Sequence, residues 1–303
     1  MKRKAIQLAH QTMVVSLPIK WVKQQGIKKG DEIDVSLYGN KLLISADFNL
    51  EPKKIRIDTK DTEFDTFKKT FAAIIKAGYN EIEIDFSSLE EARAIQKFLR
   101  NSFSNLNITK QINNTFTVSA LYESEPKEIE NAIRRFFLLV INLVEETAEC
   151  ISKKELEGLF IASLIRFDLY TLSNYIKRTI NLGYETKYKR IAPLYSIIES
   201  WMNMANIYLK IGRYMIDNKL KLKKEIADFS YKLVELHEKY YNLFYSFDLK
   251  EIQKRDAEYY KIEKQLAGLA GIISVNEIKI ISYYDMILNQ FKELTRTLIT
   301  LNI

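Results

Sequence analysis

The sequence predicts a multidomain α+β protein with a small β domain first, a small α/β sandwich second and an all-α part last. Short alternating apolar segments, separated by turn residues, occupy residues 1–50. Strand-like and helix-like segments alternate through 51–123, and a helical repeat of apolar residues runs through 124–303. A chain of 303 residues is long enough for two or three domains of this kind.

The first domain is expected to contain a strand, a short helix and a hairpin, in that order. Apolar residues alternate along the strand and are expected to face a core: Met13, Val15 and Leu17. Pro18 suits the first position of the helix, and Gly26 suits the position just past its end. Strands over 33–37 and 42–44 are joined by the hairpin dipeptide Gly39-Asn40. So small a unit buries too little surface to be stable alone, which favours a twofold dimer.

The positive charge of the chain is concentrated at the same end. The formal net charge is +7, and the first thirty residues carry seven basic side chains and no acidic one. These are Lys2, Arg3, Lys4, Lys20, Lys23, Lys28 and Lys29. The rest of the chain is therefore close to neutral. A charge excess confined to one folded segment indicates a local electrostatic task, most often binding a polyanion.

Three pieces of this domain resemble the SpoVT-AbrB (swapped-hairpin) DNA-binding domain. They are Thr12 to Lys23 (TMVVSLPIKWVK), Gly26 to Ile33 (GIKKGDEI) and Leu42 to Ile44 (LLI), in the family's order and spacing. The resemblance covers residues 1–46. It implies a dimeric β-barrel that exchanges strands between two chains and presents basic residues to DNA.

The residues expected at the DNA surface lie before the first strand, at its start and on the short helix. They are Lys2, Arg3, Lys4, His10, Gln11, Thr12, Lys20 and Lys23. Lys20 and Lys23 are three positions apart and so share one helical face. Lysine suits phosphate as a point charge, whereas Arg3 is the best candidate for a bidentate contact to guanine.

The second domain is expected to mix short strands with two helices. Strands are predicted over 54–57, 81–86, 107–109 and 115–121, and helices over 65–77 and 88–100. Gly78 ends the first helix, and Ser87-Ser88 can cap the second. The 81–86 strand alternates strictly, with Ile82, Ile84 and Phe86 on one face. Pro52 and Glu125-Pro126 mark the expected borders.

The third domain is expected to be a bundle of six long helices. Apolar residues recur at alternating steps of four and three along Leu222, Ile226, Phe229, Leu233, Leu236, Tyr240, Leu243 and Phe247. In the first helix, apolar residues recur at steps of four, three, four and four along Ile129, Ile133, Phe136, Val140 and Val144. Breaks are predicted near Ser152, Gly183, Asn218, Asp248 and Val275. Six such helices most simply fold as two three-helix bundles.

The whole arrangement resembles the archaeal PhoU-type phosphate-uptake regulators. Ala77 to Phe86 (AGYNEIEIDF) and Asn113 to Glu123 (NNTFTVSALYE) are similar to their linker region. Arg166 to Tyr170 and Ile176 to Arg178 resemble the PhoU helix that carries an acidic metal-binding motif. Here the position four before Asp168 is Leu164 rather than an acid. No metal site is therefore expected.

The residue types needed for catalysis are scarce, so the chain is not expected to be an enzyme or to hold a cofactor. No glycine-rich phosphate loop, paired-cysteine motif or His-Glu-x-x-His sequence occurs. Cys150 is the only cysteine, which excludes an internal disulfide and favours the cytoplasm. Glu145 and Glu149 share a helical face and could hold a hard cation, although such pairs are usually solvated.

The expected function is that of a DNA-binding transcriptional regulator, associated with the nucleoid, whose helical part senses or docks something related to phosphate supply or a transporter. The partners expected are double-stranded DNA, a second copy through the first domain, and a transporter or signalling protein on the helices, without membrane insertion. Two alternatives stay open: a chromatin-organising protein of low sequence specificity, and a dimeric adaptor that does not bind DNA.

Overall fold

The computed structural model describes residues 2–9, 12–38, 41–45, 54–103, 106–120, 129–182, 188, 190–271 and 274–303. It is a mixed α+β protein with small sheets and mostly helical content. The chain forms two compact units, Met1–Glu51 and Pro52–Ile303. The hairpin dipeptide Gly39-Asn40, the border residues Pro52 and Pro126 and the break at Gly183 lie outside the described residues. The division into three domains stays a prediction.

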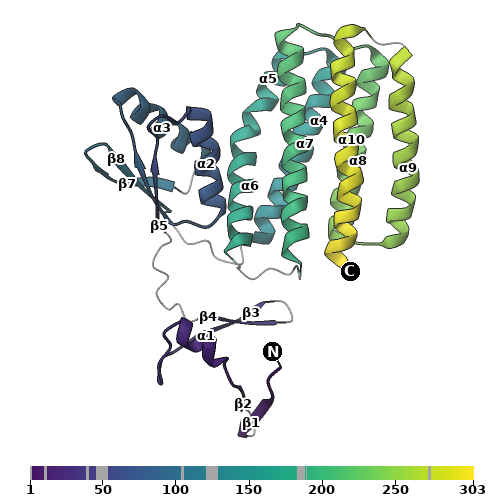
Figure 1. The fold of residues 1–303 in the computed structure, drawn as a ribbon. Helices are drawn as coiled ribbons and strands as arrows, with labels where there is room; N and C mark the ends of the chain where they lie inside the picture. The colour runs from purple at the N-terminus through teal and green to yellow at the C-terminus, as the bar shows by residue number, and fades with distance from the viewer. Residues whose placement is uncertain are drawn as a thin grey trace. The chain divides into compact units, whose positions relative to one another are not determined.

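The N-terminal unit contains two antiparallel hairpins and one short helix (Figure 1). Its elements are β1 (Ala5–Ala9), β2 (Thr12–Val15), α1 (Ile19–Gln24), β3 (Asp34–Tyr38) and β4 (Lys41–Ser45). Pro18 is the N-cap of α1, and Gly26 follows the helix with φ +68°, a conformation that costs glycine little. The described strands close no barrel within one chain. β1 is an element that the sequence patterns above did not predict.

The second unit begins with a four-stranded sheet covered by two helices. Its elements are β5 (Lys54–Asp58), α2 (Phe64–Lys76), β6 (Glu81–Asp85), α3 (Leu89–Ser102), β7 (Leu106–Ile112) and β8 (Thr115–Ala120). The strand order is β5-β6-β8-β7, in which β5 and β6 are parallel and the other pairs antiparallel. Ser88 caps α3 by accepting from the Glu91 N–H at 3.1 Å.

The alternation predicted for the 81–86 strand decides which face of the sheet meets the helices. Ile82, Ile84 and Phe86 are buried, and they share a core with Phe67 and Phe71 of α2. α2 ends where expected, with Gly78 at φ +91°. A Cβ added at this glycine would lie 2.7 Å from Leu182 Cδ2, so the Leu182 side chain would have to shift, but the positive φ is what favours glycine here.

The helical part has seven α-helices within the described ranges. They are α4 (Ile129–Lys153), α5 (Leu156–Ala162), α6 (Arg166–Asn181), α7 (Ile191–Asp217), α8 (Lys224–Tyr245), α9 (Leu249–Gly268) and α10 (Val275–Asn302). The predicted second helix is divided by a 3₁₀ turn at Ser163–Ile165, which corrects the prediction of one unbroken segment. The Ser163 hydroxyl donates to the Phe160 carbonyl at 2.6 Å in this turn. No described helix combines the length and apolar character needed to cross a bilayer.

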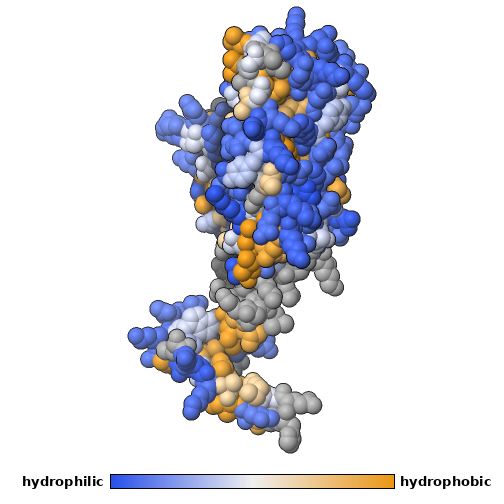
Figure 2. Space-filling model, turned by 90° about the vertical axis from the view of Figure 1, so that its right-hand side faces the viewer, coloured by the Kyte–Doolittle hydropathy of each residue, from blue (hydrophilic) through white to orange (hydrophobic). Residues whose placement is uncertain are grey.

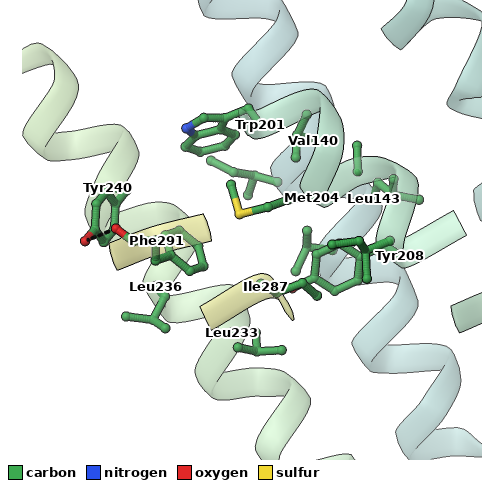
Figure 3. Close-up of a cluster of buried hydrophobic side chains, with 14 of the residues drawn as sticks. Val140, Leu143, Trp201, Met204, Tyr208, Leu233, Leu236, Tyr240, Ile287 and Phe291 are labelled. Carbon is green, nitrogen blue, oxygen red and sulfur yellow. Dashed lines mark hydrogen bonds between the residues drawn. The ribbon is translucent and has the colours of Figure 1, made fainter. Parts of the chain in front are cut away.

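A single hydrophobic core runs through the helices. The apolar residues predicted to form stripes from Ile129 to Val144 and from Leu222 to Leu243 are buried in this core. Phe247, which follows α8, is only partly buried. Figure 3 shows side chains of α4, α7, α8 and α10 converging, among them Trp201, Met204, Ile287 and Phe291. The Tyr240 hydroxyl donates to the Phe291 carbonyl at 2.9 Å in this cluster. The grouping into two three-helix bundles of the PhoU type stays a prediction.

Polar contacts join the α/β layer to α6. Arg178 Nη1 donates to the Ile75 carbonyl at 2.9 Å and to the Tyr79 carbonyl at 2.7 Å, and Nη2 donates to Asn80 Oδ1. Asn181 Nδ2 donates to the Lys76 carbonyl at 2.7 Å. The C-terminal end of α2 carries the negative end of the helix dipole, so it suits a buried guanidinium.

Candidate nucleic-acid interface

The basic side chains predicted to contact DNA are exposed wherever the structure describes them. Lys2, Arg3 and Lys4 precede β1, Thr12 begins β2, and Lys20 and Lys23 lie on α1. His10 and Gln11 lie outside the described residues. Among the described residues, none of these lysines or Arg3 forms an ion pair. Their charge is therefore available to a polyanion.

The local structure around α1 presents its lysines on one side. Lys20 and Lys23 are one helical turn apart and both exposed, whereas Trp21 and Val22 are half-buried. The helix is closed by N–H donation from Ile27 to the Val22 carbonyl at 3.1 Å. A second turn follows, in which the Lys28 N–H donates to Asp31 Oδ2 at 2.7 Å, and Lys28 and Lys29 are exposed there.

The first hairpin carries apolar side chains on both faces. Antiparallel pairing sets Ile6 opposite Val14 on one face and Gln7 opposite Met13 on the other. The expectation that Met13 and Val15 face a core is not met within one chain, because they are 63% and 50% exposed. Leu17 is half-buried. The physical reason is that two separate two-stranded ribbons enclose no interior.

Apolar surface lies beside hydrophilic surface on the described part of the N-terminal unit (Figure 2). Among the side chains of this unit whose exposure the structure describes, none is buried. The exposed large apolar residues are Ile6, Leu8, Met13, Val15, Ile19, Val35 and Leu42. Such a density of exposed apolar residues in so small a unit marks an interaction surface. Because the first hairpin is apolar on both faces, strand exchange with a second copy would bury it most completely.

We expect the native chain to have twice the mass of the 35.6 kDa monomer in light scattering at micromolar concentration. Leu8→Glu places a charge on a β1 side chain that is 72% exposed, and it should shift the mass towards the monomer. Val275→Glu is the matched control, because Val275 is exposed at the start of α10 and outside this unit. A native chain that stays monomeric would contradict the dimer.

The other residues considered as reactive or metal-binding are held in structural contacts. Cys150 is buried, and burial raises the pKa of its thiol. Glu149 pairs with Lys153 at 2.5 Å, and burial followed by the neighbouring Glu238 raises the pKa of Glu145. Within the described ranges, no three His, Cys, Asp or Glu side chains are grouped so that they could hold a metal ion.

Comparison of the chain with protein-family models, with curated proteins and with solved structures finds no match. The function is therefore inferred from the residues and their arrangement. β1 extends the predicted interface by a strand that joins Lys2, Arg3 and Lys4 to the hairpin. The alternation of Ile6 and Leu8 around Gln7 is the sequence signal that could have predicted it.

Proposed function

We propose that the protein is a DNA-binding transcriptional regulator that acts as a homodimer through its N-terminal unit. One observation carries this proposal: the basic side chains of the first thirty residues are exposed, and no acidic side chain lies in that segment to neutralise them. A duplex of uniform negative charge is the polyanion that a paired set of such side chains fits.

The finer parts of the proposal rest on resemblance. The dimer is proposed to be the swapped-hairpin barrel of the SpoVT-AbrB type, and the helical part to be a PhoU-like sensing or docking domain linked to phosphate uptake. A transporter or signalling protein is the partner proposed for the helices. The exposed apolar side chains of both ribbons support the exchange of hairpins, because Ile6, Leu8 and Met13 of the first ribbon and Val35 and Leu42 of the second are not covered within one chain.

The DNA surface is tested by replacing its lysines. Lys20→Ala and Lys23→Ala should weaken binding to all duplexes about equally, since lysine contacts phosphate rather than base edges. The slope of log K against log salt should fall by about 0.9 for each phosphate that a variant no longer binds. Arg3→Ala should instead reduce the ratio of the affinity for the preferred duplex to that for random duplexes, because arginine can form a bidentate contact to the guanine edge. Binding is measured by fluorescence anisotropy across a salt series.

The control is Glu258→Ala in α9. The Glu258 carboxylate pairs with Lys239 and Arg255, so the substitution should leave DNA affinity unchanged. Equal affinity for every duplex would favour the chromatin-organising alternative. The adaptor alternative predicts no binding to any duplex. If the two lysine variants bind with native affinity and native salt slope, the basic surface is not a DNA interface.

A further inference from the structure

A groove lined by both polar and apolar side chains lies on the helical part, far along the chain from the basic N-terminal segment. It has a volume of about 640 Å³ and is lined by α6, α7 and α10. Figure 1 shows these helices in the order α6, α7, α10, and α7 packs against both of its neighbours. The volume lies within the range typical of small-molecule sites.

Each helix contributes side chains one turn apart. Arg166 and Tyr170 come from α6, and Met286 and Gln290 come from α10. α7 contributes a polar row at steps of three and four, formed by Asn203, Asn206, Lys210 and Arg213. This spacing keeps the row on one face of α7. The described residues that line the groove include no Asp or Glu.

The antiparallel packing of α6 and α7 separates the lining into two ends. Tyr170 donates to Asn206 Oδ1 at 3.3 Å, and Lys177 pairs with Glu199 further along the same helices. Starting from the contact of Tyr170 with Asn206, one turn back along α6 and one turn forward along α7 brings Arg166 level with Lys210. Arg213 follows Lys210, so three cations gather at this end.

The other end is neutral. Asn203 and Asn206 lie there on α7. α10 runs antiparallel to α7, because the Tyr214 hydroxyl donates to the Asn276 carbonyl at 3.3 Å near the start of α10. This direction places Met286 and Gln290 beside the two asparagines. Side-chain amides can both donate and accept, and a methionine offers apolar contact to a flat ring.

Two of the three cations are free of acidic partners among the described residues. Within that part of the chain only Arg213 has one, Asp217, with 3.5 Å between Nε and Oδ2. Arg166 lies over the Tyr170 ring, with its guanidinium carbon 5.4 Å from the ring centroid. An adjacent cavity of about 690 Å³ shares Arg166 and Tyr170, but there Lys68 is paired with Asp65. The groove along α7 is therefore the better anion site.

We propose that this groove binds a nucleotide, with its phosphates at Arg166, Lys210 and Arg213 and its base and sugar at the amide end. Phosphate oxygens pair with arginine and lysine, and the edges of a base match side-chain amides. The segregation of charge within one groove is what distinguishes a nucleotide from a simple anion, which would need only the basic end. The proposal concerns ligand affinity alone, so it survives a failure of DNA binding.

The test is calorimetric titration of the full chain with ATP, GTP, CTP and UTP, and with inorganic pyrophosphate for comparison. We expect at least one nucleotide to bind more tightly than pyrophosphate. The double variant Arg166→Gln, Lys210→Gln should weaken it by about tenfold for each cation removed. Both side chains are exposed, so the variant should keep the native fold, which thermal unfolding checks.

Two further variants distinguish binding in this groove from binding to the N-terminal unit. Asn203→Leu with Asn206→Leu should remove the preference for the nucleotide over pyrophosphate. Lys20→Gln with Lys23→Gln should leave nucleotide affinity unchanged, because those lysines belong to the N-terminal unit. The proposal is overturned if no nucleotide binds at millimolar concentration, if pyrophosphate binds equally well, or if only the N-terminal variant loses affinity.

Discussion

Replacing Arg178 by alanine should lower the free energy of unfolding by about 3–5 kcal/mol. The guanidinium is buried and donates to two carbonyls and one side-chain amide at the end of α2. Without it, these acceptors keep no equivalent charged donor and stay shielded from water. Urea unfolding followed by circular dichroism measures the loss.

The same substitution should loosen one part of the molecule more than the rest. Arg178 and Asn181 bind α6 to the C-terminal turn of α2, whereas the core of the helices does not depend on them. Amide hydrogen exchange should therefore speed up in α2 and in the adjoining sheet before it does in α4 or α8. Arg178→Lys keeps the charge, but lysine cannot donate to three acceptors at once. Its free energy of unfolding and its exchange rates in α2 should therefore lie between those of the native chain and of the alanine variant.

The matched control is Arg296→Ala, because Arg296 on α10 is exposed and pairs with Glu293 at 2.8 Å. An exposed ion pair contributes roughly 0–1 kcal/mol, so this variant should be close to native. If Arg178→Ala unfolds within about 1 kcal/mol of native, the contacts at the end of α2 do not hold the layer and the helices together.

Local patterns in the sequence predicted much of the fold where the physics is local. The stripe from Leu222 to Leu243 is buried because steps of three and four put one face of a helix against its neighbours. Gly78 and Ser88 mark helix ends because left-handed backbone and a capping hydroxyl are requirements of the end itself. These signals need only a few neighbouring residues.

Features that depend on distant residues could not be predicted in this way. The turn at Ser163–Ile165 contains neither proline nor glycine, so nothing in the local sequence marks a break. The acceptors of Arg178 lie about a hundred residues before it, which no helical period can reveal. The groove on α7 needs the register of three helices, although the spacing of Asn203, Asn206, Lys210 and Arg213 was a readable signal of one polar face.

The candidate DNA surface shows the same limit in another form. Charge could be assigned from sequence, and the described basic residues are exposed as expected. Burial could not be assigned from the sequence. Met13 and Val15 alternate as core residues do, but within one chain they have no core to face. A periodic pattern states that a face should be covered and leaves open which chain covers it.

His237 provides the second large effect, an acid sensitivity that comes from one buried side chain. The ring is fully buried in the core, with centroids 4.7 Å from Phe291, 5.4 Å from Trp201 and 5.5 Å from Tyr208. Nδ1 lies 2.7 Å from the Leu233 carbonyl, which can only accept, so Nδ1 carries the proton. Nε2 has no hydrogen-bond partner among the described residues.

Burial lowers the pKa of His237 from 6.5 to about 4, because a charged ring would lose its hydration among apolar neighbours. The folded chain therefore holds the neutral ring at a pH where the unfolded chain has already bound a proton. The stabilisation is complete above pH 6.5 and is lost as the pH falls from 6.5 to about 4. The loss should be roughly 1.4 kcal/mol per pH unit, about 3 kcal/mol in all.

The measurement compares urea unfolding of the native chain and of His237→Leu at half-unit steps from pH 7.5 to pH 4. Every other titratable group is present in both chains, so its effect cancels in the difference, and the remainder belongs to His237. Leucine has no titratable proton. The native chain should therefore lose stability relative to the variant on acidification, whichever of the two is more stable at pH 7.5. Parallel profiles over the whole range would mean that the buried ring takes up its proton without loosening the core.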